Sequence, residues 1–307
     1  MKIAVVGPGA MGLLLAARLQ RAGAEVRLLD YRPERAAHIQ GQGVILEHES
    51  GSHTQAIPAK AEPTLLGEVE LAIVCTKAYH TPEVARILGL HLAPEARALT
   101  LQNGAGNVEA MVAALGAGRV LGGITSEGAT LLAIGRVRHA GQGQTHIGPA
   151  QGPVDGFTRR VLGLLQAAGF EASASEGVQN LIWTKLVVNV GINALTALLG
   201  VRNGRLLELP PAREIVAQAV GEALTVGRAR GVDFLHEDML AAVEEVARRT
   251  GANVSSMLQD VRAKRHTEVA YINGAVVRSG AELGIPTPVN ATLAKLVQAL
   301  EADYLAG

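Results

Sequence analysis

Residues 5–12, Val5-Val6-Gly7-Pro8-Gly9-Ala10-Met11-Gly12, match the pattern G-x-G-x-x-G. An apolar, β-branched run includes residues 2–6, and apolar residues at helical spacing follow at residues 11–21. At such a strand-to-helix junction the first glycine allows a tight turn, the second allows backbone to approach a pyrophosphate, and the third allows helix to pack on strand. The phosphates then lie at the positive end of the helix. Residues 7–12 therefore predict a dinucleotide-binding loop, and the alternative is a glycine-rich turn without a ligand.

The segments that follow extend this junction into a larger α/β pattern. Residues 25–29 have the composition of a second strand and complete a βαβ unit. Further apolar runs lie at residues 71–75, 98–101 and 119–124, and each precedes a helical, Gly-rich or Asn-rich segment. This order is typical of a doubly wound parallel sheet of the Rossmann type.

Residues 135–148 interrupt the alternation of strands and helices. Two β-rich runs, at residues 136–139 and 144–147, flank Gly141-Gln142-Gly143. This arrangement predicts a β-hairpin that adds antiparallel strands at the end of the region.

The second half of the chain has helical periodicity and almost no strand signal. The boundary falls near residues 170–177, where Glu171-Ala172-Ser173-Ala174-Ser175 is weakly patterned. We therefore expect a dinucleotide-binding Rossmann domain at residues 1–175 and an all-helical substrate and dimerisation domain at residues 176–307. The expected helical segments are residues 178–199, 211–230, 236–250, 256–279 and 290–304.

Length and composition agree with a two-domain globular protein. A chain of 307 residues fits two domains of about 150 residues each. With 28 basic and 28 acidic residues the net charge is zero, which argues against a nucleic-acid partner. Because Cys75 is the single cysteine, the sequence excludes an intramolecular disulfide and a multi-cysteine metal site, and we expect no metal and a cytoplasmic location. The apolar stretch 186–201 contains two asparagines and is shorter than the roughly 18 uninterrupted residues that a membrane span needs, so we expect no membrane contact.

Two residues after the second strand bear on the choice of dinucleotide. The carboxylate of Asp30 is in a position to bind the ribose 2′-hydroxyl of NAD, whereas Arg32 is in a position to bind the 2′-phosphate of NADP. These residues alone leave both cofactors open, and Arg32 also fits a solvated residue at the start of a helix.

A line of polar residues marks residues 183–195. Lys185, Asn189 and Asn193 are spaced four residues apart in an otherwise apolar helix, so they share one face. Burying an unpaired amide costs on the order of 1–3 kcal/mol, so these side chains are expected to line a wet cleft or to contact a ligand. A lysine in such a cleft can reach a pKa suited to proton transfer at neutral pH. Lys185 is therefore our candidate acid for protonating an oxygen that receives charge when a hydride attacks its carbonyl carbon.

Further polar candidates follow strands or lie near the C-terminus. Lys77 and Gln102-Asn103-Gly104 follow expected strands, where Rossmann-type sites are built. Ser256 and Gln259 form a capping-box pattern, which predicts that Ser256 caps a helix and does not exclude ligand contact. Glu268 falls in the helix expected after this cap.

These residues together resemble the ketopantoate reductase family over nearly the whole chain. The resemblance rests on Gly7–Gly12, Cys75-Thr76-Lys77-Ala78-Tyr79, Gln102-Asn103-Gly104, Thr145-His146-Ile147-Gly148, Trp183-Thr184-Lys185-Leu186 with Asn189 and Asn193, and Ser255-Ser256-Met257-Leu258-Gln259-Asp260 with Thr267-Glu268 and Tyr271-Ile272-Asn273-Gly274.

The resemblance implies a reaction, the reduction of 2-dehydropantoate to (R)-pantoate on the route to pantothenate and coenzyme A. It also implies that the catalytic residues are Lys185, as the proton donor, and Glu268. The family's two-domain form has its active cleft between a Rossmann and a helical domain. The implied substrate-binding residues are Lys185, Asn189, Asn193, Asn203 and Ser256, and the implied cofactor contacts are residues 7–12, Lys77, Asn103, Ala129 and Glu268.

Members that prefer NADP place an arginine directly after the second strand, whereas Asp30 and Tyr31 precede Arg32 here. We expect NADPH as the cofactor, with Arg32 among its contacts, and NAD as the alternative because of Asp30.

Two other functions fit parts of the sequence. The first is reduction of another 2-keto acid, or a related hydroxyacid dehydrogenase of the six-phosphogluconate-dehydrogenase-like group, whose substrate-loop signatures we do not find. The second is an NADP-sensing protein without catalysis, against which Lys185 and Glu268 argue. We expect a small-molecule 2-keto acid as the substrate and a homodimer as the assembly.

Overall fold

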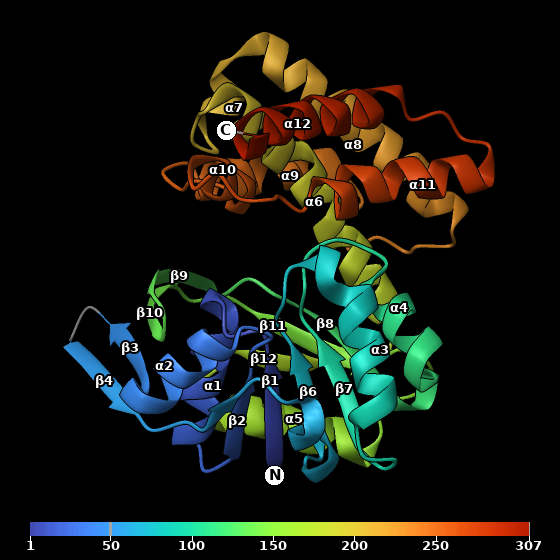
Figure 1. Ribbon diagram of the computed structural model, residues 1–307. Coiled ribbons are helices and arrows are strands. Elements are labelled where there is room, and N and C mark those ends of the chain that lie inside the picture. Colours follow the sequence, from blue (N-terminus) through green and yellow to red (C-terminus); the bar gives the residue numbers. More distant parts are fainter. Residues whose placement is uncertain (49–50, 307) are drawn as a thin grey trace. The chain divides into compact units, whose positions relative to one another are not determined.

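The computed structural model describes residues 1–48 and 51–306 and divides into two units (Figure 1). The first unit contains Met1–Gln102 and Asn107–Val178, and the second contains Asn103–Gly106 and Gln179–Gly307. Four residues from the middle of the first unit's sequence thus belong to the second unit. The sequence-based division at residues 175 and 176 does not include this excursion.

A mostly parallel sheet forms the centre of the first unit, and β1 and β6 mark its switch point. β1 pairs with β2 on one side and with β6 on the other, so the chain winds outward from β1 in both directions. In spatial order its described strands are β12 (Ala172–Ala174), β11 (Thr145–Pro149), β8 (Val120–Thr125), β7 (Arg97–Thr100), β6 (Leu71–Val74), β1 (Lys2–Val6), β2 (Glu25–Leu29) and β5 (Ala59–Lys60).

A smaller sheet covers the outer side of the first helix. Helix α1 contacts β1 and β2 of the large sheet and β3, β9 and β10 of the small one, so it is enclosed between the two sheets. This enclosure explains why α1 is apolar nearly all round, with buried residues from Gly12 to Leu19. In spatial order the described strands of the small sheet are β4 (Gly51–Gln55), β3 (Val44–His48), β10 (Arg136–Gly141) and β9 (Gly128–Ala133).

Helices connect the strands of the first unit and pack beside them. Because parallel crossovers are right-handed and the chain winds both ways from β1, α1 and α3 cover opposite faces of the large sheet. Helix α5 contacts α1, and α4 contacts α3. The helical elements of this unit are α1 (Ala10–Arg21), α2 (Pro33–Gln42), α3 (Thr81–His91), α4 (Asn107–Leu115), α5 (Gly156–Ala167) and the 3-10 turns η1 (Pro63–Glu68), η2 (Ala78–His80) and η3 (Ala117–Arg119).

The described part of the second unit is helical. Its own hydrophobic core gathers around the long helix α6, with Trp183, Leu186, Val187 and Val190 buried against residues of the other helices. The elements are α6 (Val178–Leu199), α7 (Arg205–Glu208), α8 (Pro210–Ala229), α9 (Met239–Arg249), α10 (Ser256–Arg262), η4 (Val269–Tyr271), α11 (Asn273–Leu283) and α12 (Pro288–Ala306). The expected fold class, a Rossmann-type doubly wound sheet followed by an all-α region, is confirmed.

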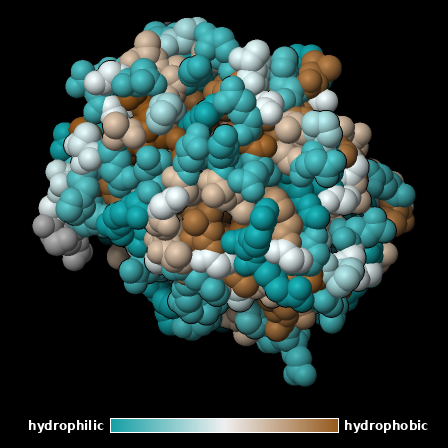
Figure 2. Space-filling view, turned by 90° about the horizontal axis from the view of Figure 1, so that it is seen from below, coloured by the Kyte–Doolittle hydropathy of each residue, from teal (hydrophilic) through white to brown (hydrophobic). Residues whose placement is uncertain are grey.

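Helix α6 is long and apolar enough to cross a membrane, but it is mostly buried. It has 22 residues, and 72% of its most apolar window is buried inside the protein. Burial of this extent is typical of the core helix of a soluble domain. On the face drawn in Figure 2, hydrophilic residues predominate and hydrophobic residues form small separate patches.

Two local expectations were wrong. Residues 136–139 and 144–147 form strands, but not a hairpin: β10 pairs with β9 and β3, whereas β11 pairs antiparallel with β8 of the large sheet. The weakly patterned residues 171–175, near which the domain boundary was expected, contain β12, an edge strand that pairs parallel with β11.

The single helix expected at residues 256–279 is instead three elements. Helix α10 ends at Arg262, and Lys264 then adopts a left-handed backbone conformation with φ of 51°. The Arg265 guanidinium and backbone N–H both bond to Asp260, which turns the chain back on α10. Helical periodicity on either side concealed this turn.

Candidate active site

The glycine loop of the first unit has the geometry that its three glycines predict. Gly7 has φ of 94°, and a Cβ there would lie 2.7 Å from Thr76 Cγ2, so the loops after β1 and β6 touch. A Cβ at Gly12 would overlap the carbonyl oxygen of Gly7, whereas a Cβ at Gly9 would have no heavy atom of the described residues within 4 Å. The second glycine thus faces open space, and α1 begins at the next residue. This arrangement fits a pyrophosphate at the start of α1.

A cavity of about 340 Å³ lies beside the glycine loop in the first unit. Its volume is in the range of small-molecule sites. Most of the lining is apolar, which suits a flat aromatic base, and the polar residues Tyr31, Thr76, His80 and Glu83 lie among it. The apolar lining residues are Val6, Leu29, Ala61, Pro63, Leu66, Val84, Ile87 and Leu88, together with Gly7. Sequence analysis missed this cavity, because most of its lining residues come from short, separate segments outside the glycine motif.

Asp30 and the arginines after it surround the end of β2. Asp30 is 1% exposed; its Oδ1 accepts the backbone N–H of Arg32 at 3.1 Å, and its Oδ2 forms an ion pair with Arg35 Nε at 2.8 Å. Arg32 is exposed, and its guanidinium lies 5.2 Å from the ring of Tyr31. The structure therefore gives Asp30 two partners within its own chain.

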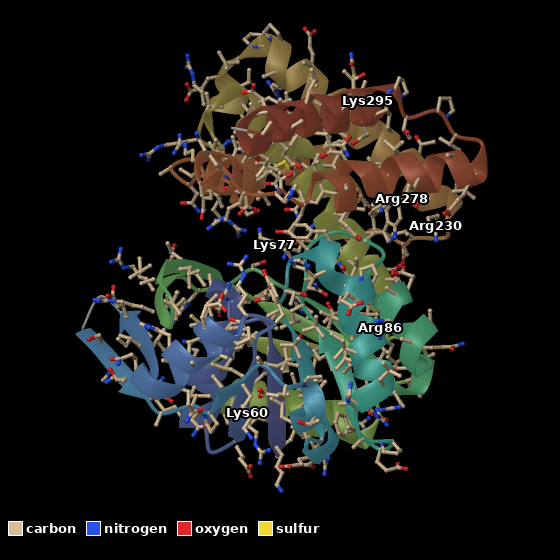
Figure 3. The ribbon with its side chains drawn as sticks, in the orientation of Figure 1. Lys60, Lys77, Arg86, Arg230, Arg278 and Lys295 are labelled. Atoms are coloured by element: carbon tan, nitrogen blue, oxygen red, sulfur yellow. The ribbon has the colours of Figure 1, made fainter. Side chains whose placement is uncertain are left out.

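Other cofactor candidates of the first unit lie on separate elements. Lys77 precedes η2 and lies beyond the carboxyl ends of the strands of its unit (Figure 3). Gln102 donates to the carbonyl oxygen of Thr76 at 2.8 Å, which links the loops after β6 and β7. Ala129 is half-buried on β9 of the small sheet.

In the second unit, Asn103 joins the two residues expected to be catalytic. Lys185 Nζ donates to Asn103 Oδ1 at 3.0 Å, and Asn103 Nδ2 lies 3.5 Å from Glu268 Oε2. Glu268 is 6% exposed, and Lys185 is half-buried on α6. A half-buried amide thus connects an ammonium to a carboxylate, and all three groups belong to one unit.

A tight backbone contact holds Asn103 in this unit. Gly104 has φ of 86°, and a Cβ there would overlap the carbonyl oxygen of Tyr271. Ala105 N–H donates to that same oxygen at 3.0 Å. Glycine is required at residue 104 both by its backbone angle and by this approach.

Burial sets the proton affinity of Lys185. Desolvation lowers the pKa of Lys185 to about 8, and the charge of Glu268 opposes part of this shift. A lysine with this pKa is largely an ammonium at neutral pH and can release its proton readily. The acid predicted from the polar line is therefore chemically suited to the role.

The remaining substrate candidates gather around α6 and the start of α10. Asn193 is 5% exposed on the face that carries Lys185 and the half-buried Asn189. Asn203 donates to Thr250 Oγ1 at 2.9 Å, while its buried Oδ1 has no hydrogen-bond partner among the described residues. Such an unsatisfied buried acceptor is uncommon in native structures.

Ser256 is not the helix cap. Ser255 caps α10 by accepting the N–H of Leu258 at 3.1 Å, and its hydroxyl also bonds to Thr196 of α6 at 2.7 Å. Ser256 is the first residue of α10 and is exposed. The pattern placed the cap one residue too late: Ser256 has a glutamine three residues on, but the hydroxyl that caps the helix is that of Ser255. Glu268 likewise lies before η4 rather than within a long helix.

Among residues 1–48 and 51–306, no group of three or more His, Cys, Asp and Glu side chains is arranged to hold a metal ion. Burial raises the pKa of the Cys75 thiol to about 12, so Cys75 is a packing residue rather than a nucleophile.

Comparison with known proteins assigns the chain to a family. A family model described as ketopantoate reductase PanE/ApbA matches residues 3–152, and one described as its C-terminal part matches residues 177–301. The chain belongs to the ketopantoate reductase family. The family resemblance inferred from the sequence is thereby confirmed.

Relatives of this ketopantoate reductase family member align over its full length. The 2-dehydropantoate 2-reductase of Halobacterium salinarum is 37% identical over 304 residues, covering 99% of this chain and 100% of the relative. A crystal structure of a PanE/ApbA family ketopantoate reductase from Ralstonia eutropha has a TM-score of 0.92 at 30% identity, covering 99% of this chain and all of that one. D-mandelate dehydrogenase with NADH and anilino(oxo)acetate also has a TM-score of 0.92, at 27% identity and the same coverage. The fold is therefore shared by oxidoreductases that differ in substrate.

Proposed function

We propose that this protein reduces 2-dehydropantoate to (R)-pantoate with NADPH, as a step in pantothenate and coenzyme A biosynthesis. The observation that carries the proposal is the Lys185–Asn103–Glu268 arrangement, with the pKa of Lys185 lowered to about 8 by burial. The name of the 37%-identical relative supports the choice of substrate. Its alignment over 304 residues includes the segments of all three side chains.

The first unit supplies the features needed to bind a nicotinamide dinucleotide. The open space at Gly9 and the N–H groups at the start of α1 suit the pyrophosphate, and the neighbouring cavity suits the adenine. We further propose Lys77, Ala129 and Arg32 of this unit, and Asn103 and Glu268 of the second unit, as cofactor contacts. When bound, the reduced nicotinamide supplies a hydride.

The second unit supplies the acid. Hydride addition to C2 of the keto acid places negative charge on the C2 oxygen, and the Lys185 ammonium both stabilises that charge and protonates it. Asn103 fixes Lys185 through its amide oxygen, and the nearby charge of Glu268 keeps the ammonium form populated. We propose Asn189, Asn193, Asn203 and Ser256 as the residues that bind the hydroxyl and carboxylate groups of the substrate.

We also propose the organisation expected from the sequence: a cofactor domain at residues 1–175, a substrate and dimerisation domain at residues 176–307, a homodimer, and a cytoplasmic location. The zero net charge supports the absence of nucleic-acid partners.

A second candidate function is reduction of a different 2-keto acid with NADH. The likeness to D-mandelate dehydrogenase, over 99% of this chain, favours it. The two candidates share the hydride transfer and the Lys185 proton and differ in the side chain accepted at C3 of the keto acid.

The test is oxidation of NADPH and of NADH by the purified protein with 2-dehydropantoate or benzoylformate. Lys185→Ala is the catalytic variant, and Lys295→Ala is its control because Lys295 is exposed on α12 of the same unit (Figure 3). Rapid turnover of 2-dehydropantoate that only Lys185→Ala abolishes supports the proposal. Turnover of benzoylformate alone selects the second candidate, and binding of a cofactor without turnover of any keto acid leaves the sensor function.

A further inference from the structure

Asp30 lies where a carboxylate selects NAD, but its oxygens are already engaged within the protein. A carboxylate that binds the ribose of NAD must present an accessible oxygen to the ribose 2′-hydroxyl. Asp30 is 1% exposed, and its Oδ1 accepts the backbone N–H of Arg32, the residue before α2. The carboxylate thus fastens the start of α2 to the end of β2.

The other oxygen of Asp30 holds Arg35. Arg35 Nε lies 2.8 Å from Asp30 Oδ2, and this oxygen makes no hydrogen bond of good geometry to the described residues. A buried carboxylate needs compensation for its lost hydration, and the ion pair with Arg35 provides it. The carboxylate therefore fixes where the guanidinium lies.

Arg35 is directed toward the dinucleotide loop. Its Nη2 lies 3.5 Å from the carbonyl oxygen of Pro8, and 24% of its side-chain surface is exposed. A guanidinium has five N–H donors, and these two contacts involve only two of them. An anion next to the glycine loop can therefore bind Arg35 without disturbing Asp30.

Arg32 lies between Asp30 and Arg35 in the sequence. It is exposed, and its guanidinium lies beside Tyr31, which lines the cavity next to Gly7. Two guanidinium groups thus border the end of β2, and guanidinium forks bind phosphate groups strongly.

We propose that Arg35, positioned by the buried carboxylate of Asp30, binds the adenosine 2′-phosphate of NADP together with Arg32. Asp30 is then a positioning residue that favours NADP, although its place in the sequence suggests NAD. The inference rests on the proposed nicotinamide-dependent function and states which form of the cofactor the site selects.

The test measures binding of two fragments to the full chain by calorimetry: adenosine 2′,5′-bisphosphate, which carries the 2′-phosphate, and adenosine 5′-monophosphate, which lacks it. Arg35→Ala is expected to weaken binding of the bisphosphate by about 10- to 100-fold, the usual contribution of a charge-assisted hydrogen bond, and to change binding of the monophosphate little. The KM for NADPH should rise in parallel while the KM for NADH stays nearly constant.

Asp30→Asn separates positioning from direct contact. It should weaken bisphosphate binding less than Arg35→Ala does, and should have no further effect in the Arg35→Ala background. Glu34→Gln is the matched control, because Glu34 is an exposed carboxylate in the first turn of α2, and it should leave the preference unchanged.

If Asp30→Asn binds the bisphosphate more tightly, or the monophosphate more weakly, the proposal is overturned and Asp30 is a residue that binds the ribose. If Asp30→Asn weakens bisphosphate binding equally in the presence and in the absence of Arg35, the positioning role of Asp30 is overturned. If Asp30→Asn does not fold, Arg35→Ala still decides, since unchanged bisphosphate binding contradicts the proposal. Fragment binding needs no keto acid, so a protein that fails to reduce 2-dehydropantoate but shows the expected fragment pattern refutes only the proposed substrate.

Discussion

The glycine loop of the first unit and the Lys185 cluster of the second present polar groups to ligands in different ways. The loop uses the backbone of six consecutive residues, and its shape depends on three missing side chains at Gly7, Gly9 and Gly12. The cluster uses the side chains of Lys185, Asn103 and Glu268. Along the chain, Lys185 lies 82 residues from Asn103 and Glu268 lies 165 residues from Asn103. One site is local and the other depends on the packing of the second unit. Substitutions in the loop should therefore act on cofactor binding, and substitution of Lys185 in the cluster should act on proton transfer.

The largest expected effect separates chemistry from binding. Lys185→Ala removes the acid and should lower kcat for keto acid reduction about 10²- to 10⁴-fold, the usual range for a general acid. The dissociation constant for NADPH, measured by fluorescence, should change far less. An equal loss of binding and turnover would mean that the cluster also shapes the cofactor site.

The next comparison lies within the glycine loop. A methyl group at residue 12 would overlap the Gly7 carbonyl, so Gly12→Ala should reduce the free energy of unfolding by about 3 kcal/mol, as overpacking does. A methyl group at residue 9 points into open space, so Gly9→Ala should keep its stability in urea unfolding and lose about tenfold or more in NADPH affinity. Equal stability of the two variants would contradict the separate roles given to these glycines.

The corresponding glycine in the cluster is Gly104. Because its φ is 86° and a Cβ would overlap Tyr271, Gly104→Ala should cost about 1–3 kcal/mol of stability and displace Asn103 from Lys185. The temperature of thermal unfolding and kcat should both fall. A variant with normal stability and normal kcat would show that this contact does not hold the cluster together.

The difference between the local glycine loop and the dispersed Lys185 cluster also explains how much of each site the sequence could predict. The strand, turn and helix around Gly7 are encoded in adjacent residues, and the spacing of Lys185, Asn189 and Asn193 is fixed by helix geometry, so both were predicted. The residues that tie Asn103 to the second unit, such as Tyr271, come from distant segments that share no local pattern. The resemblance supplied Asn103 and Glu268 as candidates but not their contact through one amide.

The sequence could not predict the arrangement of the small sheet or of the end of β2, for a different reason. Strand β10 pairs with β9 and β3 because α1 offers an apolar face that the pattern of residues 136–147 does not reveal. Asp30 was correctly placed after β2, but whether its carboxylate faces a ligand or an arginine five residues further along the chain depends on burial, which the sequence does not state.

The smallest expected effect concerns the electrostatics of the cluster. The charge of Glu268 raises the proton affinity of Lys185, so Glu268→Gln should lower the pKa of Lys185 further and reduce its ammonium fraction at a given pH. Reduction needs the ammonium, so the decline of kcat at high pH should begin at a lower pH in this variant. An unchanged kcat profile would remove Glu268 from the tuning of Lys185.

The measurement that tests the central claim most directly is the pH dependence of kcat in both directions of the reaction. In the proposed mechanism, reduction of 2-dehydropantoate with NADPH uses protonated Lys185, so its rate should be full below the pKa of about 8 and fall as the pH rises through it. Oxidation of pantoate with NADP⁺ uses the neutral amine and should rise over the same interval. The predicted result is that kcat for reduction falls and kcat for oxidation rises near pH 8, and that both changes disappear in Lys185→Ala. If neither kcat changes with pH between about pH 7 and 9, Lys185 is not the proton donor.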